Sequence, residues 1–399
     1  MTLGIGRIVA IGGLLGFALL GTGASGSGTR YVEADLVVNK EVNGVPTLTD
    51  KNGVVHTAAN FDPGLVNPWG ISESGSSPFW ISDNGAGATT LYNTAGQPQP
   101  LAVSIPAPGD PLGSGGAPTG QAFNIASAQN AFPITGVNGG GVATTLPATF
   151  LFATEDGTIL GWNGGVFPAS VPPPPPSPPN KHAIIAVDNS ASDAVYKGMA
   201  IAVDSTGAAL LYATNFRAGT VEVYDSGFHP VNLPSDAFTD RHLPRGYAPF
   251  NIVPVTLNGL TELFVSYAKQ NVEKKDDVAG QGHGIVNTFD PAGHLLRRFA
   301  RHGQLDSPWG MALAPGGFGE FGGDLLIGNF GNGHINAYDV MTGHFRGKVR
   351  ALHGKAIVID GLWALKFGNG GNGGDANTLY FTAGPNSEAD GLFGSLKPE

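Results

Sequence analysis

Residues 82–93 read SDNGAGATTLYN, and two later segments repeat this pattern. Residues 213–225 read ATNFRAGTVEVYD, and residues 327–339 read IGNFGNGHINAYD. Each copy has a strand-like run, a tight turn rich in Asn, Asp and Gly, and a second run that ends in an aromatic residue followed by Asn or Asp. Such turn residues between two strand-like runs predict a β-hairpin. Hairpins that recur after several tens of residues predict a repeat architecture, and this repeat length is typical of a β-propeller.

Six repeats can be aligned when each hairpin is joined to the strand before it. Two of the strand starts share a Pro-Trp-Gly motif, at Pro68-Trp69-Gly70 and Pro308-Trp309-Gly310. The other four starts lie near Pro118, Tyr196, Pro249 and Asp360. The sequence therefore predicts an all-β fold, a six-bladed β-propeller with four strands in each blade and almost no helix. The Trp residues are expected to fill the space between blades, because each blade interface needs a large aromatic side chain.

The first 24 residues have the composition of a targeting segment. Arg7 precedes an apolar run at residues 8–20, and the small residues Thr22, Gly23 and Ala24 follow it. This order predicts a secretory signal peptide. An uncleaved membrane anchor is the alternative, but the run is shorter than the ~20 residues that a span needs. We expect a signal peptide at 1–24, a single β-propeller domain at 25–399, and a secreted or periplasmic protein with no membrane span after cleavage.

The two ends of the predicted domain complement each other. The strand-like run at residues 31–38 has no hairpin of its own, and the sixth repeat ends near residue 396 without an outer strand. We expect the N-terminal strand to join the last blade, because this pairing covers an exposed edge. A polyproline insertion at residues 171–179 is expected to form an exposed polyproline II segment.

Charge and composition argue against several classes of protein. The formal net charge is −10, and the chain has no Cys. An acidic chain without a basic cluster argues against nucleic acid as a partner, and the absence of Cys excludes disulfides and thiolate metal sites. The densest run of charge, at residues 273–277, is balanced and is typical of an exposed loop. The sequence has neither a G-x-S-x-G motif nor a nucleophilic Cys, so it gives nucleophilic catalysis no support.

Chain direction predicts which face of the ring carries a site. In a four-stranded blade the inner strand starts at one face, and the turn after the second strand returns to that face. The inner-strand starts and the Asn/Asp-Gly turns should therefore meet at one mouth of the channel, whereas Gly-rich loops at 316–323 and 368–375 occupy the other face. The residues expected to bind a ligand are Asn67, Asp83, Asn84, Asn215, Asn251 and Asn329. Turn formation alone is the competing interpretation, since tight turns need Asn, Asp and Gly.

Two functions fit such a face. The favoured one is an exported binding module, not an enzyme, whose ligand is a glycan, a peptide or a partner in the cell envelope. The alternative is a divalent-metal-dependent hydrolase of lactonase or esterase type, in which a channel-bound cation polarises a carbonyl. Asp306 and Asp360 are the candidate metal ligands, because carboxylate oxygens suit a hard cation such as Ca²⁺. The binding module needs no cofactor, and the sequence identifies no catalytic residue.

Several phrases resemble a known family of proteins. Asn67-Pro68-Trp69-Gly70, Gly328-Asn329-Phe330-Gly331 and the run Asn377–Gly384 are similar to segments of a bacterial family of exported β-propeller proteins of uncharacterised function. The resemblance covers nearly the whole chain after residue 24. It implies a six-bladed propeller and export, with a distant relation to NHL-repeat and lactonase-like propellers. It implies no activity, and it provides no catalytic residues.

Overall fold

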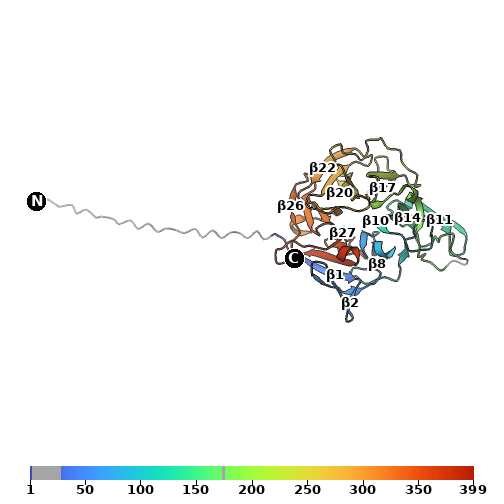
Figure 1. Cartoon of the computed structure of the whole chain (residues 1–399), viewed down its shortest axis with the longest axis horizontal. Coiled ribbons are helices and arrows are strands. Elements are labelled where there is room, and N and C mark those ends of the chain that lie inside the picture. Colours follow the sequence, from blue (N-terminus) through green and yellow to red (C-terminus); the bar gives the residue numbers. More distant parts are fainter. Residues whose placement is uncertain (2–27, 173–175) are drawn as a thin grey trace.

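A computed structural model describes Met1, residues 28–172 and residues 176–399 (Figure 1). The expected signal peptide and residues 173–175 of the polyproline insertion lie outside the described residues.

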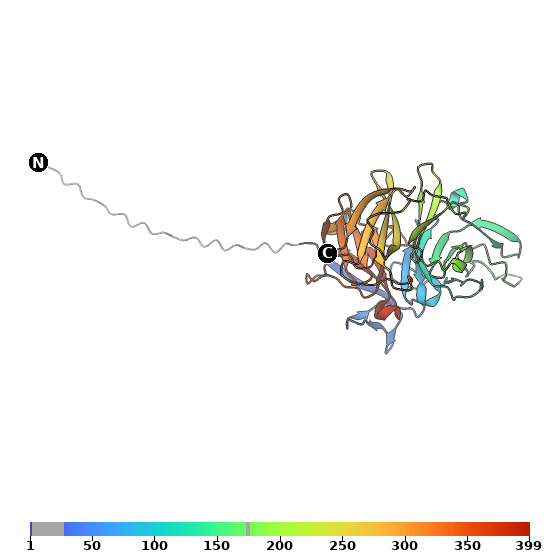
Figure 2. The ribbon, with the colours of Figure 1, turned by 45° about the horizontal axis from the view of Figure 1, so that its top comes forward.

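The described residues form an all-β, propeller-like arrangement of antiparallel sheets around a centre (Figures 1 and 2). The first four sheets in chain order are β6 (Pro68–Ser72), β7 (Phe79–Asp83), β8 (Ala88–Tyr92) and β9 (Val103–Ser104); β10 (Pro118–Phe123), β13 (Phe150–Thr154), β14 (Thr158–Trp162) and β15 (Ile184–Asp188); β16 (Tyr196–Val203), β17 (Ala209–Asn215) and β18 (Thr220–Tyr224); and β19 (Tyr247–Leu257), β20 (Leu260–Lys269), β21 (Gly284–Phe289) and β22 (Leu295–Arg301). The next two are β23 (Pro308–Leu313), β24 (Asp324–Asn329), β25 (Ile335–Asp339) and β26 (Phe345–Lys348); and β27 (Leu362–Phe367), β28 (Leu379–Ala383), β29 (Leu392–Pro398), β1 (Tyr31–Val38) and β5 (Asn60–Phe61).

Two smaller sheets lie at the rim (Figures 1 and 2). They are β2 (Glu41–Val42), β3 (Val45–Thr49) and β4 (Val55–Thr57); and β11 (Pro133–Val137) and β12 (Ala143–Pro147). The described helices are short: η1 (Asn84–Ala86), η2 (Ser127–Gln129), η3 (Ser190–Ser192), η4 (Gly319–Phe321) and α1 (Pro385–Glu388). Among the described residues, no helix is long and apolar enough to cross a membrane.

The first strands of the six large sheets surround the centre. They contact one another in the order β6, β10, β16, β19, β23, β27 and back to β6. Apolar side chains fill the space between neighbouring sheets; Leu151 of β13 and Leu211 of β17, for example, belong to one buried cluster. The recurrent hairpins are β7–β8, β17–β18 and β24–β25, as the repeat pattern predicts. Gly87, Gly219 and Gly333 provide the left-handed backbone in their turns, with φ of 62°, 75° and 69°, a conformation that favours glycine.

The N-terminal strand β1 pairs with the last repeat, so this prediction is confirmed. Tyr31 lies opposite Pro398, and Val38 lies opposite Leu392, in an antiparallel ladder. Val37 and Val38 are fully buried, and the Tyr31 hydroxyl donates a hydrogen bond of 3.1 Å to the Phe318 carbonyl. The burial of these side chains makes β1 part of the core of the last sheet.

The expectation of four strands in every sheet is wrong for the β16 sheet. Only β16, β17 and β18 form its ladder among the described residues. The next segment approaches β18 through a single bridge between Tyr224 and Pro230. The Val231 N–H still donates a hydrogen bond of 2.8 Å to the Val223 carbonyl, but the pairing does not continue into a fourth strand.

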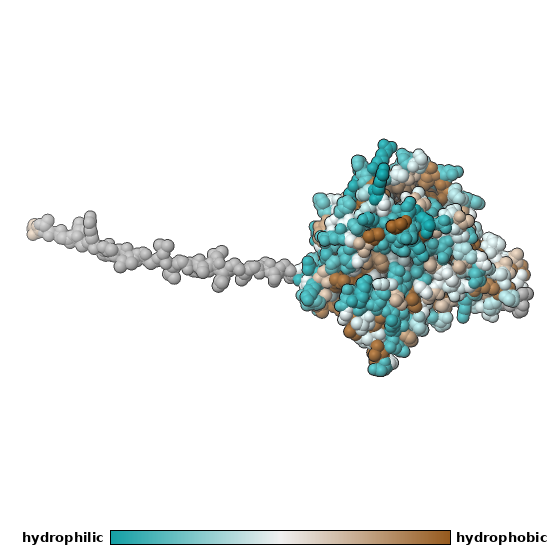
Figure 3. Space-filling model, in the orientation of Figure 1, coloured by the Kyte–Doolittle hydropathy of each residue, from teal (hydrophilic) through white to brown (hydrophobic). Residues whose placement is uncertain are grey.

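The molecular surface is mainly polar on the face shown in Figure 3, where apolar residues appear as small separate spots. This view agrees with a chain that carries net negative charge and a mean hydropathy near zero, +0.03.

Candidate functional site

The mouth of the central channel is built from one repeated irregularity. All six inner strands shift register against their neighbours near their first residues, as between Pro68 and Ile71 and between Tyr196 and Gly198. A β-bulge of this kind redirects side chains and is common beside functional sites. The residues that follow the first residue of each irregularity are Trp69, Thr119, Lys197, Phe250, Trp309 and Trp363.

Small residues let the inner strands approach one another at this level. A Cβ on Gly70 would lie 2.6 Å from the Thr119 carbonyl oxygen, and a Cβ on Gly310 would lie 2.4 Å from the Trp363 carbonyl oxygen. Asn251 occupies the matching place in β19, and its Nδ2 donates a hydrogen bond of 2.8 Å to the Trp309 carbonyl. The Pro-Trp-Gly motif is therefore explained: the tryptophan reaches the centre, and the glycine lets the next strand come close.

Three tryptophans close this mouth of the channel. The rings of Trp69 and Trp363 stack with centroids 3.5 Å apart, and Trp309 meets both edge-on at 5.9 and 5.7 Å. All three are at most 3% exposed. The expectation that they lie between blades is corrected here, because they pack against one another at the centre. Trp80 and Trp162, in contrast, lie in the cluster between the β6 and β10 sheets.

A buried lysine lies beside this tryptophan cluster. The Lys197 side chain is 3% exposed, and its Nζ forms an ion pair with Glu155 and lies 3.4 Å from Asp276 Oδ1. The same Nζ lies 5.0 Å from the centroid of the Trp69 ring, within range of a cation–π contact. Burial lowers the pKa of Lys197, but the neighbouring carboxylates, Glu155 foremost, outweigh this effect and raise it. Lys197 therefore remains a cation inside the channel mouth.

Two further carboxyl groups surround the lysine. Burial raises the pKa of Asp277, although Lys197 opposes the shift. Burial also raises the pKa of Glu388 to about 7, with contributions from Glu155 and Asp276. Glu388 follows Asn386 and Ser387 in α1, and all three have positive φ, at 69°, 59° and 57°. Left-handed non-glycine residues cost free energy and gather at functional sites.

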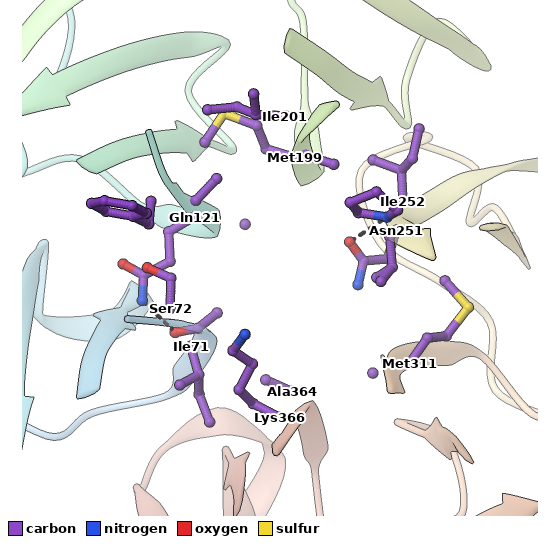
Figure 4. Close-up of a pocket in the computed structure, with 18 of the residues that line it drawn as sticks. Ile71, Ser72, Gln121, Met199, Ile201, Asn251, Ile252, Met311, Ala364 and Lys366 are labelled. Carbon is purple, nitrogen blue, oxygen red and sulfur yellow. Dashed lines mark hydrogen bonds between the residues drawn. The ribbon is translucent and has the colours of Figure 1, made fainter. Parts of the chain in front are cut away.

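The channel itself holds a cavity of about 270 Å³ on the inner side of the tryptophan cluster. Its walls are mainly aliphatic, with Met199, Ile252 and Met311 among the lining side chains (Figure 4). Gln121 and Asn251 lie on opposite sides, and the Lys366 side chain extends inward (Figure 4). Because the lining residues run from the start of each inner strand towards its end, the cavity extends towards the face opposite the hairpin turns.

Some polar atoms on the cavity wall are unpaired. Gln121 Nε2 donates a 3.0 Å hydrogen bond to the Gly70 carbonyl, but Gln121 Oε1 and Ser72 Oγ have no hydrogen-bond partner among the described residues. Glu73 Oε1 pairs with Lys366 Nζ at 3.0 Å, and burial raises the pKa of Glu73 despite this cation. Because these unpaired atoms have almost no accessible surface, they are buried behind the cavity wall and do not define what a ligand must offer.

The structure brings together only part of the predicted ligand set. Asn67 accepts a hydrogen bond of 3.1 Å from Trp363 Nε1, and Asn84 donates one of 3.1 Å to Glu155. These two residues therefore belong to the closed mouth, and Asn251 lines the cavity. Asn215, Asn329 and Asp83 lie in separate hairpins, where their side chains bond to local partners.

The two predicted metal ligands also have local partners. Asp306 Oδ1 accepts a 2.7 Å hydrogen bond from the Gly280 N–H. Asp360 pairs with Lys51 at 2.7 Å and accepts a 2.9 Å hydrogen bond from the Asn386 N–H. A cation bound by these carboxylates would have to compete with these contacts.

Four charged residues at the channel mouth are absent from the predicted ligand set. Lys197 occupies the position that Trp69 and Trp309 hold in other repeats, and aligning the repeats is the signal that identifies it. Glu155 lies in a recurrent turn. Asp276 and Asp277 belong to the charge run that was interpreted as an exposed loop, and no local pattern indicates that the loop reaches the channel mouth.

Comparison with known proteins gives relatives of uncharacterised function. No family model matches the chain. Two proteins of Acanthamoeba polyphaga mimivirus, uncharacterised proteins R648 and L690, are each 30% identical to it; the alignments cover 85% of this chain and 76% and 82% of the two relatives. A solved structure from Bacteroides thetaiotaomicron, of unknown function, aligns over 93% of this chain and 76% of its own with a TM-score of 0.51 at 11% identity. This likeness concerns the fold alone.

Proposed function

The chain belongs to the same family as the mimivirus proteins R648 and L690, and from this premise we propose that it is an exported, six-bladed propeller that binds a small ligand in its central channel. The order of contacts among the six inner strands and the pairing of β1 with β29 support a closed ring. The composition of residues 1–24 supports export.

The observation that carries the binding function is the cavity closed at one end. Aliphatic walls surround a hollow of about 270 Å³, and Asn251 and Lys366 are among the polar residues that line it. A pocket with apolar walls and a few fixed polar groups is the usual form of a small-molecule site. The ligand class is a small apolar molecule or an apolar peptide side chain. A glycan fits less well, because its many hydroxyls would meet few polar partners here.

A fluorescent probe with an apolar body tests this site. Full-length protein is titrated with anilinonaphthalene sulfonate, whose anion also suits Lys366 at the cavity wall. The variant Ala364→Phe fills the cavity, and Ala95→Phe adds the same ring at an exposed position away from it. We expect at least a tenfold loss of probe affinity in the first variant and no change in the second, with both variants shown to be folded by circular dichroism. Equal affinity of the wild type and both variants for the probe would exclude the channel as the binding site.

The metal-dependent hydrolase remains the alternative on the turn face. Its test is a titration with Ca²⁺ in which the melting temperature is recorded. If Ca²⁺ raises the melting temperature of the wild type but not that of the double variant Asp306→Ala, Asp360→Ala, the result would favour the hydrolase over the channel-binding module.

A further inference from the structure

A second polar cluster lies away from the channel, where β1 meets β4. Glu33 and Asp35 are two residues apart on β1, so their side chains leave the same face of the strand. His56 is the middle residue of β4 and is 3% exposed. One potential ligand atom from each of these three residues lies within 4.8 Å of the other two.

The two nitrogens of the His56 ring face different carboxylates. Nδ1 lies 3.3 Å from both carboxylate oxygens of Asp35. Nε2 lies 3.8 Å from Asp50 Oδ2, and both the Asp50 and His56 side chains are at least 96% buried. Nε2 and Asp50 Oδ2 have no hydrogen-bond partner among the described residues. The 3.8 Å separation is too long for a hydrogen bond, so Nε2 and Asp50 Oδ2 face each other on the side of the ring opposite Asp35, each without a hydrogen-bond partner among the described residues.

The charge of the cluster is unbalanced. Three carboxylates surround one imidazole, so even a protonated ring leaves a net charge of −2 when all the carboxylates are ionised. A cation would reduce the repulsion between Glu33 and Asp35. Elsewhere in the molecule Lys and Arg pair with buried carboxylates, but the charged groups that act on His56 are these three carboxylates.

We propose that Glu33, Asp35 and His56 Nδ1 bind one divalent transition-metal ion, and that Zn²⁺ is the best match. Imidazole together with carboxylate is a typical donor set for Zn²⁺, whereas Ca²⁺ prefers six to eight oxygen ligands. Three protein ligands leave a position for water. With the metal on Nδ1, the Nε2 proton points towards Asp50, and a carboxylate behind a metal-bound histidine is the usual arrangement. Asp50 is therefore a positioning residue.

The site would connect two parts of the fold. Glu33 and Asp35 belong to the strand that pairs with β29, and His56 belongs to the small rim sheet that packs on β1. Bonds from one ion to both elements would hold the rim sheet against the seam of the ring.

Isothermal titration of the full chain with ZnCl₂ tests the proposal. We expect one Zn²⁺ per chain in the wild type, at least tenfold weaker binding in Glu33→Gln and Asp35→Asn, and unchanged binding in the matched control His294→Ala, which removes an exposed histidine paired with Asp290 at 2.9 Å. Circular dichroism and melting confirm that the conservative variants are folded. No binding, or equal binding by the wild type and Asp35→Asn, would overturn the site.

Substitution with Co²⁺ gives a second readout. The visible absorption of the bound ion should show nitrogen and oxygen ligation in the wild type and lose intensity in His56→Gln. Asp50→Asn should weaken Zn²⁺ binding by about 10- to 100-fold, the usual effect of changing a carboxylate that orients a metal-bound histidine, and keep the Co²⁺ spectrum. Loss of the spectrum in Asp50→Asn would make Asp50 a direct ligand and contradict the assigned geometry, and a Ca²⁺ affinity equal to that for Zn²⁺ would contradict the choice of metal.

Discussion

At the scale of single residues, the channel mouth concentrates buried charge. Lys197 and Glu155 form an ion pair in which the side chains are 3% and 10% exposed. Desolvating two charges is expensive, and only a well-formed pair offsets that cost. Such a pair contributes more to fixing the arrangement of the mouth than to net stability.

Removing one partner of this ion pair should destabilise the protein. Lys197→Met leaves the Glu155 carboxylate buried without its cation, and we expect a loss of about 3–5 kcal/mol in the free energy of unfolding. Adding Glu155→Gln should recover most of the loss, because the carboxylate that paired with Lys197 is then neutral as well. Urea denaturation of the wild type, both single variants and the double variant measures the coupling. Additive effects in this cycle would mean that the two side chains do not interact.

Glu388 predicts a pH dependence. Its pKa is about 7 in the folded protein and about 4.5 in the unfolded chain, so the folded state binds the proton more tightly. The resulting stabilisation is complete below pH 4.5 and is lost as the pH rises through 7. Glu388→Gln should therefore match the wild type at pH 4.5 and exceed its stability by about 1–2 kcal/mol at pH 8. Thermal melts at both pH values measure this difference in stability. Glu273→Gln, in an exposed loop, is the control. An identical pH profile for the wild type and Glu388→Gln would contradict the prediction.

At this scale the sequence predicts where a residue lies if the backbone imposes the residue type, and ligand binding by Asn67 and Asn84 stays a prediction. Asn67 and Asn84 occupy a repeated start and a repeated turn, and both reach the channel mouth. Glu388 could not be found in the same way, because it approaches Lys197 through a left-handed segment that no local pattern encodes. The Glu33, Asp35 and His56 cluster depends on how a rim sheet packs against β1, and this packing is a tertiary property.

At the scale of elements, β1 alternates between a buried and an accessible environment. Val37 is fully buried, whereas Val32 is 42% exposed. The pairing of this strand with β29 could be predicted because one end of the chain had a strand in excess and the other lacked one. The three-stranded ladder of the β16 sheet could not be predicted by counting repeats, because the recurrent pattern defines the hairpin and not the outer strand.

Two valine substitutions on β1 separate core packing from strand propensity. Val37→Ala should lower the free energy of unfolding by about 1–3 kcal/mol, because it removes buried apolar groups and leaves a cavity. Val32→Ala makes the same chemical change on the same strand at an exposed position and should stay within about 0.5 kcal/mol. Chemical denaturation compares them. Equal effects of the two substitutions would show that Val37 is not in the core.

At the scale of the whole molecule, neighbouring sheets share their buried side chains around the ring. No sheet is an independent unit in this arrangement, so damage to one seam should affect all of them. The sequence predicted the recurrent hairpins β7–β8, β17–β18 and β24–β25 because hairpin turns require particular residues. The sequence did not predict the cavity, because its position depends on how the side chains of the six inner strands pack at the centre.

Deletion of residues 28–40 tests this cooperativity. The change removes β1 and exposes the edge of β29, and we expect a fall in stability of several kcal/mol with loss of a single sharp transition. Deletion of residues 138–142 shortens the tip of the β11–β12 hairpin at the rim and serves as the control, with little expected effect. Differential scanning calorimetry compares the two. An unchanged melting temperature after the first deletion would refute a role for β1 in holding the ring.

The pairing of β1 with β29 also sets the order in which the molecule can be made. Tyr31 is synthesised long before Pro398, yet they face each other in one ladder. During translation, the other five large sheets can assemble from neighbouring segments as they emerge, but β1 has no partner strand from the last repeat until residues 392–398 have been added. Contacts between such distant segments slow the final step of folding. Until then β1 is not paired with β29. Chaperones and, if the chain is exported, the translocation machinery can bind the unfinished chain in this state.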